Sequence, residues 1–186
     1  GNRAAWGFNV RSGAFKDVRQ GQVGASWMGS LGSLDSQFAL WGIRRELFNP
    51  IPGRVIDLTR NAGGVRSLFQ GQTSLDKRTT FGWGAGFEIE LQRDDRLNFK
   101  NNGGDPGDRI LDQLEHVTAR GLFIQGRLDT VERLSILAGL RYDNINFSAI
   151  DNFLIAGDPD DTGEREMSAF SPSLGAVLSL SDDSEL

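Results

Sequence analysis

The sequence predicts an all-β protein, specifically an antiparallel up-and-down transmembrane β-barrel of which about eight strands are present. Two observations predict this class. Apolar residues alternate with polar or small residues over segments of about ten residues, and short and long polar connections separate these segments in turn. Alternation places all the apolar side chains of a strand on one face. A barrel strand turns only that half of its residues toward lipid, so a mean hydropathy of -0.33 is compatible with this class.

The composition bounds the alternatives. The 186 residues are enough for one domain, which we expect to be a single partial barrel over residues 1–186 of a longer protein. No apolar run approaches the roughly 18 to 20 residues of a membrane helix, which excludes a helical membrane protein. The absence of cysteine excludes disulfide scaffolds and thiolate sites. A net charge of -5, with no basic stripe, argues against nucleic-acid binding.

The clearest strand is 81–92. Its apolar positions are Trp83, Ala85, Phe87, Ile89 and Leu91, and its alternate positions are Gly82, Gly84, Gly86, Glu88, Glu90 and Gln92. At about 3.3 Å per residue, eleven residues tilted by roughly 45° rise about 26 Å, close to the apolar band of an outer-membrane barrel. An average soluble strand is about half as long.

Further strands are predicted at 6–10, 22–31, 118–129, 134–147 and 170–180, all of which alternate. Two more, 37–45 and 64–73, have weaker patterns, the first being apolar on both faces. The register of 118–129 follows from its charges, because a shift of one residue would turn Arg127 toward lipid at a cost of about 2 to 4 kcal/mol. In the chosen register only Arg120 faces lipid, close to the outer end of the strand. Candidates for interfacial aromatic girdles are Trp6, Trp27, Trp41, Trp83 and Tyr142.

The connections are expected to alternate in length. Short turns are predicted at 32–36, 75–78 and 129–132, and long polar loops at 12–19, 47–63, 93–115 and 148–165. Outer-membrane barrels have short periplasmic turns and long extracellular loops, so this alternation also predicts which end faces outward. Two alternatives stay open: a small closed outer-membrane barrel of eight strands, and a soluble β-sandwich that acts as a binding or structural module.

A set of short motifs near the C-terminus carries a family resemblance. "FIQGRLDTVERLSILAGLRYDNINF" and the following "FSPSLGAVLSL" resemble the barrel of TonB-dependent receptors of the Gram-negative outer membrane. The matching positions are Phe123, Gln125, Gly139, Leu140, Arg141, Tyr142, Asp143, Ser171, Pro172, Leu174 and Gly175. The resemblance covers about residues 80 to 180. It implies a barrel of about 22 strands, together with a plug and a TonB-contacting box that this stretch of sequence does not contain.

The resemblance implies energy-coupled uptake of a scarce nutrient, such as a ferric siderophore, cobalamin or a glycan, without choosing among them. It also implies the outer membrane as the location, with membrane lipid, the ligand and a TonB-type complex that acts through the plug as partners. We expect no enzyme activity, no cofactor, no metal site and no nucleic-acid partner. His116 is the only histidine, and the acidic stretches 101–108 and 157–166 lack EF-hand spacing.

The candidate ligand-binding residues are polar side chains predicted to face the lumen. Glu88 and Glu90 share one strand face about 7 Å apart, and we expect them to be hydrated or to pair with Arg127 on the adjacent strand. The full set of candidates is Glu88, Glu90, Gln125, Arg127, Arg141 and Asp143.

Overall fold

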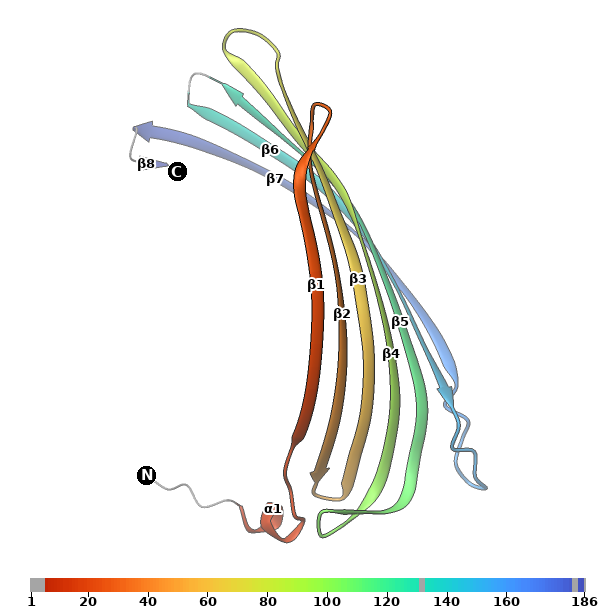
Figure 1. Ribbon diagram of the computed structural model, residues 1–186. Helices are drawn as coiled ribbons and strands as arrows, with labels where there is room; N and C mark the ends of the chain where they lie inside the picture. Colours follow the sequence, from red (N-terminus) through yellow and green to blue (C-terminus); the bar gives the residue numbers. More distant parts are fainter. Residues whose placement is uncertain (1–5, 131–132, 182–183, 186) are drawn as a thin grey trace.

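The computed structural model describes residues 6–130, 133–181 and 184–185. A short helix, α1 (Gly7–Arg11), precedes seven long strands and a two-residue strand (Figure 1). The strands are β1 (Asp17–Leu31), β2 (Leu34–Ile51), β3 (Arg54–Ser74), β4 (Thr79–Asn102), β5 (Asp105–Thr130), β6 (Leu134–Asp151), β7 (Gly163–Ser181) and β8 (Ser184–Glu185). Among the described residues, no helix has the length and apolar character needed to cross a membrane.

Each strand pairs antiparallel with the strand that follows it in the sequence. Partners across an antiparallel ladder share a face, so the register sorts the side chains of the sheet into two sets. The apolar face carries Trp27, Phe38, Leu40, Val65, Phe69, Phe87, Ile89, Leu91, Leu122, Ile124, Ile136, Leu140, Tyr142, Phe170 and Leu174. The opposite face, here called the polar face, carries Asp35, Gln70, Arg66, Glu88, Gln125, Arg127, Arg141 and Asp143.

The apolar face is uncovered. Leu122 is 61% exposed and Leu174 is 82% exposed. Val55 is the only buried residue among the described Val, Leu, Ile, Met and aromatic side chains. A soluble β-sandwich would bury such a face against a second sheet to form its core, so the structure contradicts the sandwich alternative.

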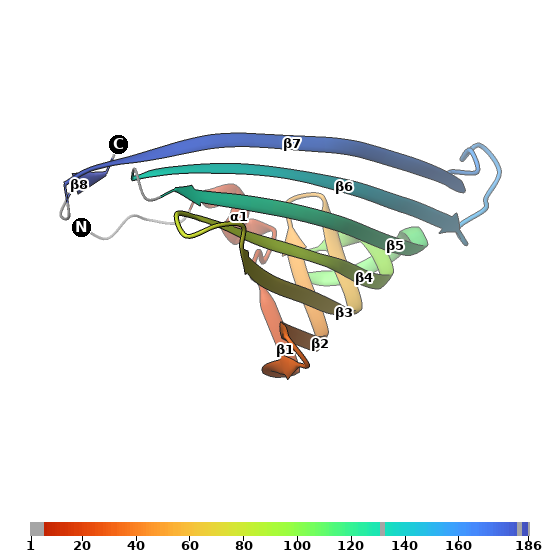
Figure 2. The same cartoon turned by 90° about the horizontal axis from the view of Figure 1, so that it is seen from above.

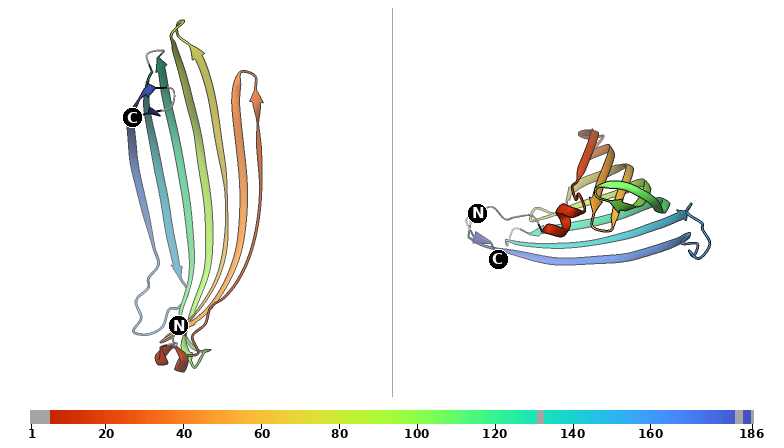
Figure 3. Two further views of the ribbon diagram at one scale, coloured as in Figure 1. Left: turned by 90° about the vertical axis from the view of Figure 1, so that its left-hand side faces the viewer. Right: turned by 90° about the horizontal axis from the view of Figure 1, so that it is seen from below.

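The sheet is curved, and α1 lies on its concave side (Figure 2). A hollow of about 660 Å³ reaches from Asp35 on β2 to Ser173 on β7 across residues of the polar face. A hollow that spans so many strands needs the concave side of a sheet, so the polar face is the concave one. Its strands tilt and bow together along their length (Figure 3).

Two of the predicted long loops are wrong. Residues 47–63 form the end of β2, a turn at Pro52 and Gly53, and the start of β3; residues 93–115 are likewise β4 and β5 joined at Gly103 and Gly104. These segments are rich in charged and polar residues and lack a sustained apolar alternation, which suggested loops. They remain strands beyond the apolar belt because their backbone groups pair with those of the neighbouring strands. β4 and β5 therefore reach 24 and 26 residues.

The remaining connections follow the predictions more closely. The β1–β2 turn is short, with Gly32 at φ 64°, and residues 75–78 join β3 to β4. The long β6–β7 connection exists but is confined to Asn152–Thr162. The predicted turn at 129–132 includes residues 131–132, which lie outside the described residues.

The predicted first strand at 6–10 is also wrong, because Gly7–Arg11 is helical. Its backbone donors are satisfied locally: the amides of Asn9 and Val10 donate to the Trp6 carbonyl at 2.9 and 3.2 Å. Trp6 thus precedes a helix and belongs to no strand girdle. Seven long strands remain instead of eight, and the relative directions of the others are as predicted.

One asparagine ties α1 to two hairpin tips. The Asn101 side-chain amide donates to the carbonyls of Ser12 at 2.8 Å and of Ile51 at 2.9 Å, while its Oδ1 accepts from the Gly104 amide at 2.7 Å. Gly13, with φ 56°, packs directly on Gly103, so that a Cβ at Gly13 would overlap the Gly103 carbonyl. This end of the sheet is therefore held as one unit.

Candidate functional site on the polar face

Four charged residues meet at the centre of the polar face and are here called the central cluster: Arg66, Glu88, Arg141 and Asp143. Glu88 lies between two arginines, with its Oε1 3.1 Å from Arg66 Nε and its Oε2 2.7 Å from Arg141 Nη2. Arg141 also donates to Asp143 from Nε at 2.9 Å. The cluster joins β3, β4 and β6, three strands brought together only by the fold.

The predicted pairing of Glu88 and Glu90 with Arg127 is wrong. Arg127 donates to Asp129 Oδ1 at 2.7 Å on its own strand and to the Ser135 hydroxyl at 3.2 Å. Across the β4–β5 ladder Arg127 faces Gly82, which lies six residues from Glu88 along β4. That ladder places Gly121 opposite Glu88, and the side chain of Arg141 extends over this glycine.

Phe123 occupies the gap between the two arginines of the central cluster. Its ring centroid lies 6.0 Å from Arg66 Cζ and 5.9 Å from Arg141 Cζ, within range of cation–π attraction on both sides. Gly86 leaves space for the ring, since a Cβ there would stand 2.6 Å from Phe123 Cζ and would overlap the Ser67 carbonyl. Gly86 on β4 and Gly121 on β5, which have no side chains, thus leave the space that the central cluster and the Phe123 ring occupy.

A second group, here called the outer cluster, lies toward the hairpin tips and comprises Arg45, Arg60, Asp94, Arg96 and Glu115. Asp94 is 2% exposed and accepts from Arg60 Nε at 2.8 Å and Nη2 at 2.6 Å. Arg96 pairs with Glu115 at 3.3 Å. Arg45 faces Arg60 directly across the β2–β3 ladder, and its buried Nε has no hydrogen-bond partner among the residues that the structure describes. Three arginines and two carboxylates leave the outer cluster one positive charge in excess.

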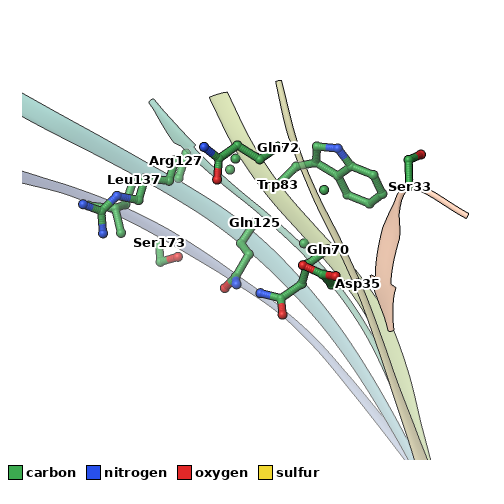
Figure 4. A pocket seen from close by; sticks show the side chains of 14 residues that line it. Ser33, Asp35, Gln70, Gln72, Trp83, Gln125, Arg127, Leu137 and Ser173 are labelled. Atoms are coloured by element: carbon green, nitrogen blue, oxygen red, sulfur yellow. The ribbon is translucent and has the colours of Figure 1, made fainter. Parts of the chain in front are cut away.

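The hollow described above lies at the opposite end of the polar face, near the short turns. Gln70 and Gln125 flank Gly84, which pairs with both of them, and Asp35 stands beside Gln70 on the next strand (Figure 4). The Gln125 side chain leans over the glycine, since a Cβ at Gly84 would lie 3.3 Å from its Nε2. Amide side chains both donate and accept hydrogen bonds, so Gln70 and Gln125 offer both kinds of group to the hollow.

All six residues proposed from the sequence lie on the polar face, as their alternation predicts. The structure brings Glu88, Arg141 and Asp143 together and leaves Glu90, Gln125 and Arg127 apart from them. Trp41, predicted as a girdle residue, also lies on the polar face, where it faces Gly24 and Gly64. Trp27 and Trp83 are on the apolar face.

Sequence reasoning missed Arg66 and the whole outer cluster. Arg66 lies in the segment 64–73, whose alternation is poor. Four residues of the outer cluster lie in segments interpreted as loops, and Arg45 ends the predicted strand 37–45, which is apolar on both faces. A usable signal was present in β4, where Gln92, Asp94 and Arg96 continue the polar positions of 82–90 without a break in register. The face as a whole offers ion pairs, free donors and amide groups to solvent, which suits recognition of a polar ligand.

Comparison with known proteins is consistent with these features. The family model "TonB dependent receptor-like, beta-barrel" matches residues 1–186. Similar solved structures include the ferric citrate transporter FecA, with a TM-score of 0.69 at 13% identity. The ferric yersiniabactin uptake receptor FyuA from Yersinia pestis gives 0.61 at 13%, and the siderophore receptor PiuA from Acinetobacter baumannii gives 0.67 at 8%.

These structural matches cover 90%, 91% and 91% of this chain but only 26%, 27% and 31% of FecA, FyuA and PiuA respectively. At such identities they establish the fold alone, and the chain spans less than a third of each of these proteins. The family as a whole consists of outer-membrane transporters and receptors of Gram-negative bacteria rather than enzymes. The family match over every residue, together with an uncovered apolar face and a charged concave face, identifies this chain as a member of the TonB-dependent receptor β-barrel family.

Proposed function

We propose that the protein containing this chain is a TonB-dependent transporter of the outer membrane that takes up a ferric siderophore. The family match over residues 1–186 carries this proposal. FecA and FyuA, whose folds this chain shares, are described as a ferric citrate transporter and a ferric yersiniabactin uptake receptor. In this proposal β1–β7 form part of the barrel wall, with the apolar face toward lipid and the polar face toward a water-filled lumen.

The charges of the polar face favour an anionic ligand. The outer cluster has one positive charge in excess, and the buried Nε of Arg45 finds no hydrogen-bond partner within the described part of the chain. An anion near Arg45 would relieve its repulsion with Arg60 and satisfy that nitrogen. A ferric chelate with carboxylate donors carries negative charge that the outer cluster would neutralise. The binding of cobalamin or a neutral glycan does not require an excess of positive charge in the site. We propose that the ligand first meets the outer cluster and then the central cluster.

The proposed contact residues on the inner part of the path are those predicted from the sequence: Glu88, Glu90, Gln125, Arg127, Arg141 and Asp143. Glu88, Arg141 and Asp143 already satisfy one another, so they hold the wall in shape as well as meeting the ligand. Gln125 faces the hollow without an ion pair and offers exchangeable hydrogen bonds. Energy coupling would come from a TonB-type complex acting through a plug.

Uptake of radioactive iron by cells that depend on the intact protein tests the proposal. We expect a ferric siderophore to be taken up in an energy-dependent manner, and Arg45→Gln to raise the ligand concentration that gives half-maximal uptake. Arg44→Gln is the matched control, because Arg44 is adjacent in sequence but lies on the opposite face, paired with Glu46. Uptake of cobalamin or a glycan, but of no ferric chelate, would refute the ligand class. The absence of any uptake, with ligand binding retained, would favour a binding module.

The orientation of the sheet has its own test. The hairpins ending at Ile51 and Asn102 extend far beyond the apolar belt, and such extensions face outward in outer-membrane barrels. A peptide tag inserted between Gly103 and Gly107 should therefore bind antibody on intact cells, and a tag at Thr130 should bind only after lysis. The reverse pattern would invert the assignment of the two ends.

A further inference from the structure

On β5 to β7 the apolar face ends at one level, because the positions next to Leu122, Tyr142 and Phe170 on the same face are Arg120, Asn144 and Ser168. Tyr142 and Phe170 form a ring pair with centroids 4.7 Å apart. Arg120 lies one position further toward the hairpin tips on the same face, opposite Ile89 on one side and Asn144 on the other. Arg120 is exposed, and among the residues that the structure describes it has no hydrogen-bond or ion-pair partner.

The surface below Arg120 is hollowed rather than flat. A groove of about 460 Å³ is lined on its apolar side by Phe87, Ile89, Leu122 and Tyr142, and its polar edge includes Arg120 and Glu166. The groove thus combines an apolar trough at the level of the aromatic pair with a free guanidinium at its outer end. The apolar part of the groove matches the acyl chains of a lipid, and the guanidinium at its outer end matches a charged headgroup.

We propose that this groove binds an anionic lipid, with its phosphate on Arg120 and one acyl chain along Phe87 and Leu122. Guanidinium donates paired hydrogen bonds to phosphate oxygens, and its long stem allows the charge to reach the headgroup level while the stem covers apolar surface. An arginine facing lipid is tolerated near the interface, where its cost falls to about 0 to 1 kcal/mol. In this proposal the lipid phosphate pairs with the Arg120 guanidinium and makes the contact specific for an anionic headgroup.

Glu166 limits the strength of this site. Its Oε1 accepts a hydrogen bond from Asn144 Nδ2 at 2.7 Å, which holds the carboxylate on the same face of the sheet as Arg120. A carboxylate repels a nearby phosphate. Substitutions of these two residues should therefore have opposite effects: loss of Arg120 weakens lipid binding, and neutralising Glu166 strengthens it.

The proposal rests on the membrane location included in the proposed function, and native mass spectrometry of the intact purified protein in detergent tests it. Phosphatidylglycerol is the probe, phosphatidylcholine is the zwitterionic comparison, and inorganic phosphate is a separate arm. We expect phosphatidylglycerol to bind in preference to phosphatidylcholine. Arg120→Gln should reduce the phosphatidylglycerol affinity about tenfold, the loss of one charge-assisted contact, and Glu166→Gln should raise it.

Arg165→Gln is the matched control. Arg165 is exposed, has no hydrogen-bond or ion-pair partner among the described residues, and lies on the polar face, three residues nearer the hairpin tips than the level of Arg120. It should leave lipid binding unchanged. Equal losses in the Arg120 and Arg165 variants, an unchanged Arg120→Gln, or displacement of the lipid by millimolar phosphate would each overturn the proposal. Carbonate extraction of membranes separates the two hypotheses: an extractable protein refutes the membrane location, whereas an integral protein without lipid preference refutes only the lipid site.

Discussion

The Arg60–Asp94 pair allows a quantitative test of how the polar face is stabilised. The two partners differ sharply in exposure: the side chain of Asp94 is 2% exposed and that of Arg60 is 36% exposed. Arg60→Ala leaves a buried carboxylate with only the Gln92 amide, at 3.2 Å, as a partner. Asp94→Ala leaves an arginine that water can reach. Truncating the exposed partner should therefore cost more than truncating the buried one.

The expected magnitudes follow from the two environments. An uncompensated buried charge costs about 3 to 5 kcal/mol, which we expect for Arg60→Ala. Loss of hydrogen bonds to a charge that can be rehydrated costs about 1.5 to 3 kcal/mol, which we expect for Asp94→Ala. The double variant should be more stable than the sum of the single losses predicts, because neither charge is then stranded. Urea titration of the intact protein in lipid vesicles measures these free energies of unfolding.

The control pair is Arg44 and Glu46, on the apolar side of the same hairpin. Its side chains are 62% and 47% exposed, so Glu46→Ala should change the free energy of unfolding by about 0 to 1 kcal/mol. If Asp94→Ala costs as much as Arg60→Ala, or if the two losses simply add, burial of the carboxylate does not control the energetics and the reasoning fails.

Three further predictions concern local geometry. Asn101→Ala removes the side chain that joins α1 to two hairpin tips, so hydrogen exchange should accelerate in residues 7–16 while the strands stay protected; unchanged exchange there would contradict the proposed tie. Gly86→Ala should lower the midpoint of urea unfolding by displacing a neighbouring ring, whereas Gly82→Ala, with nothing within 4 Å, should not. Hydrogen bonds from Thr162 lower the pKa of Asp160 below 3.8, so the turn they form should persist above that pH and be lost as the pH falls through the lowered pKa, seen as faster exchange of the Thr162 amide. Exchange independent of pH, after correction for its intrinsic rate, would refute this last prediction.

Much of the fold could be predicted because local pattern and global fold agree over the apolar belt. From Trp83 to Leu91 every second residue is apolar, and only a strand with one lipid-facing side makes use of that pattern. The family resemblance around Arg141 and Asp143 rested on the same region. The prediction failed where the belt ends: residues 93–102 are mostly polar, with Leu97 and Phe99 as their only apolar side chains, so the apolar alternation that marks the belt stops there.

The candidate site divides in the same way. The sequence alone determined which side chains of β4, β5 and β6 share the polar face, because alternation in a strand is a local property. Only the tertiary structure decided that Glu88 meets Arg66 and Arg141, because that contact depends on the stagger between strands more than 20 residues apart and on the space left by Gly86 and Gly121. Alternation assigns a residue to a face, whereas the hydrogen-bond register between strands selects its neighbours there.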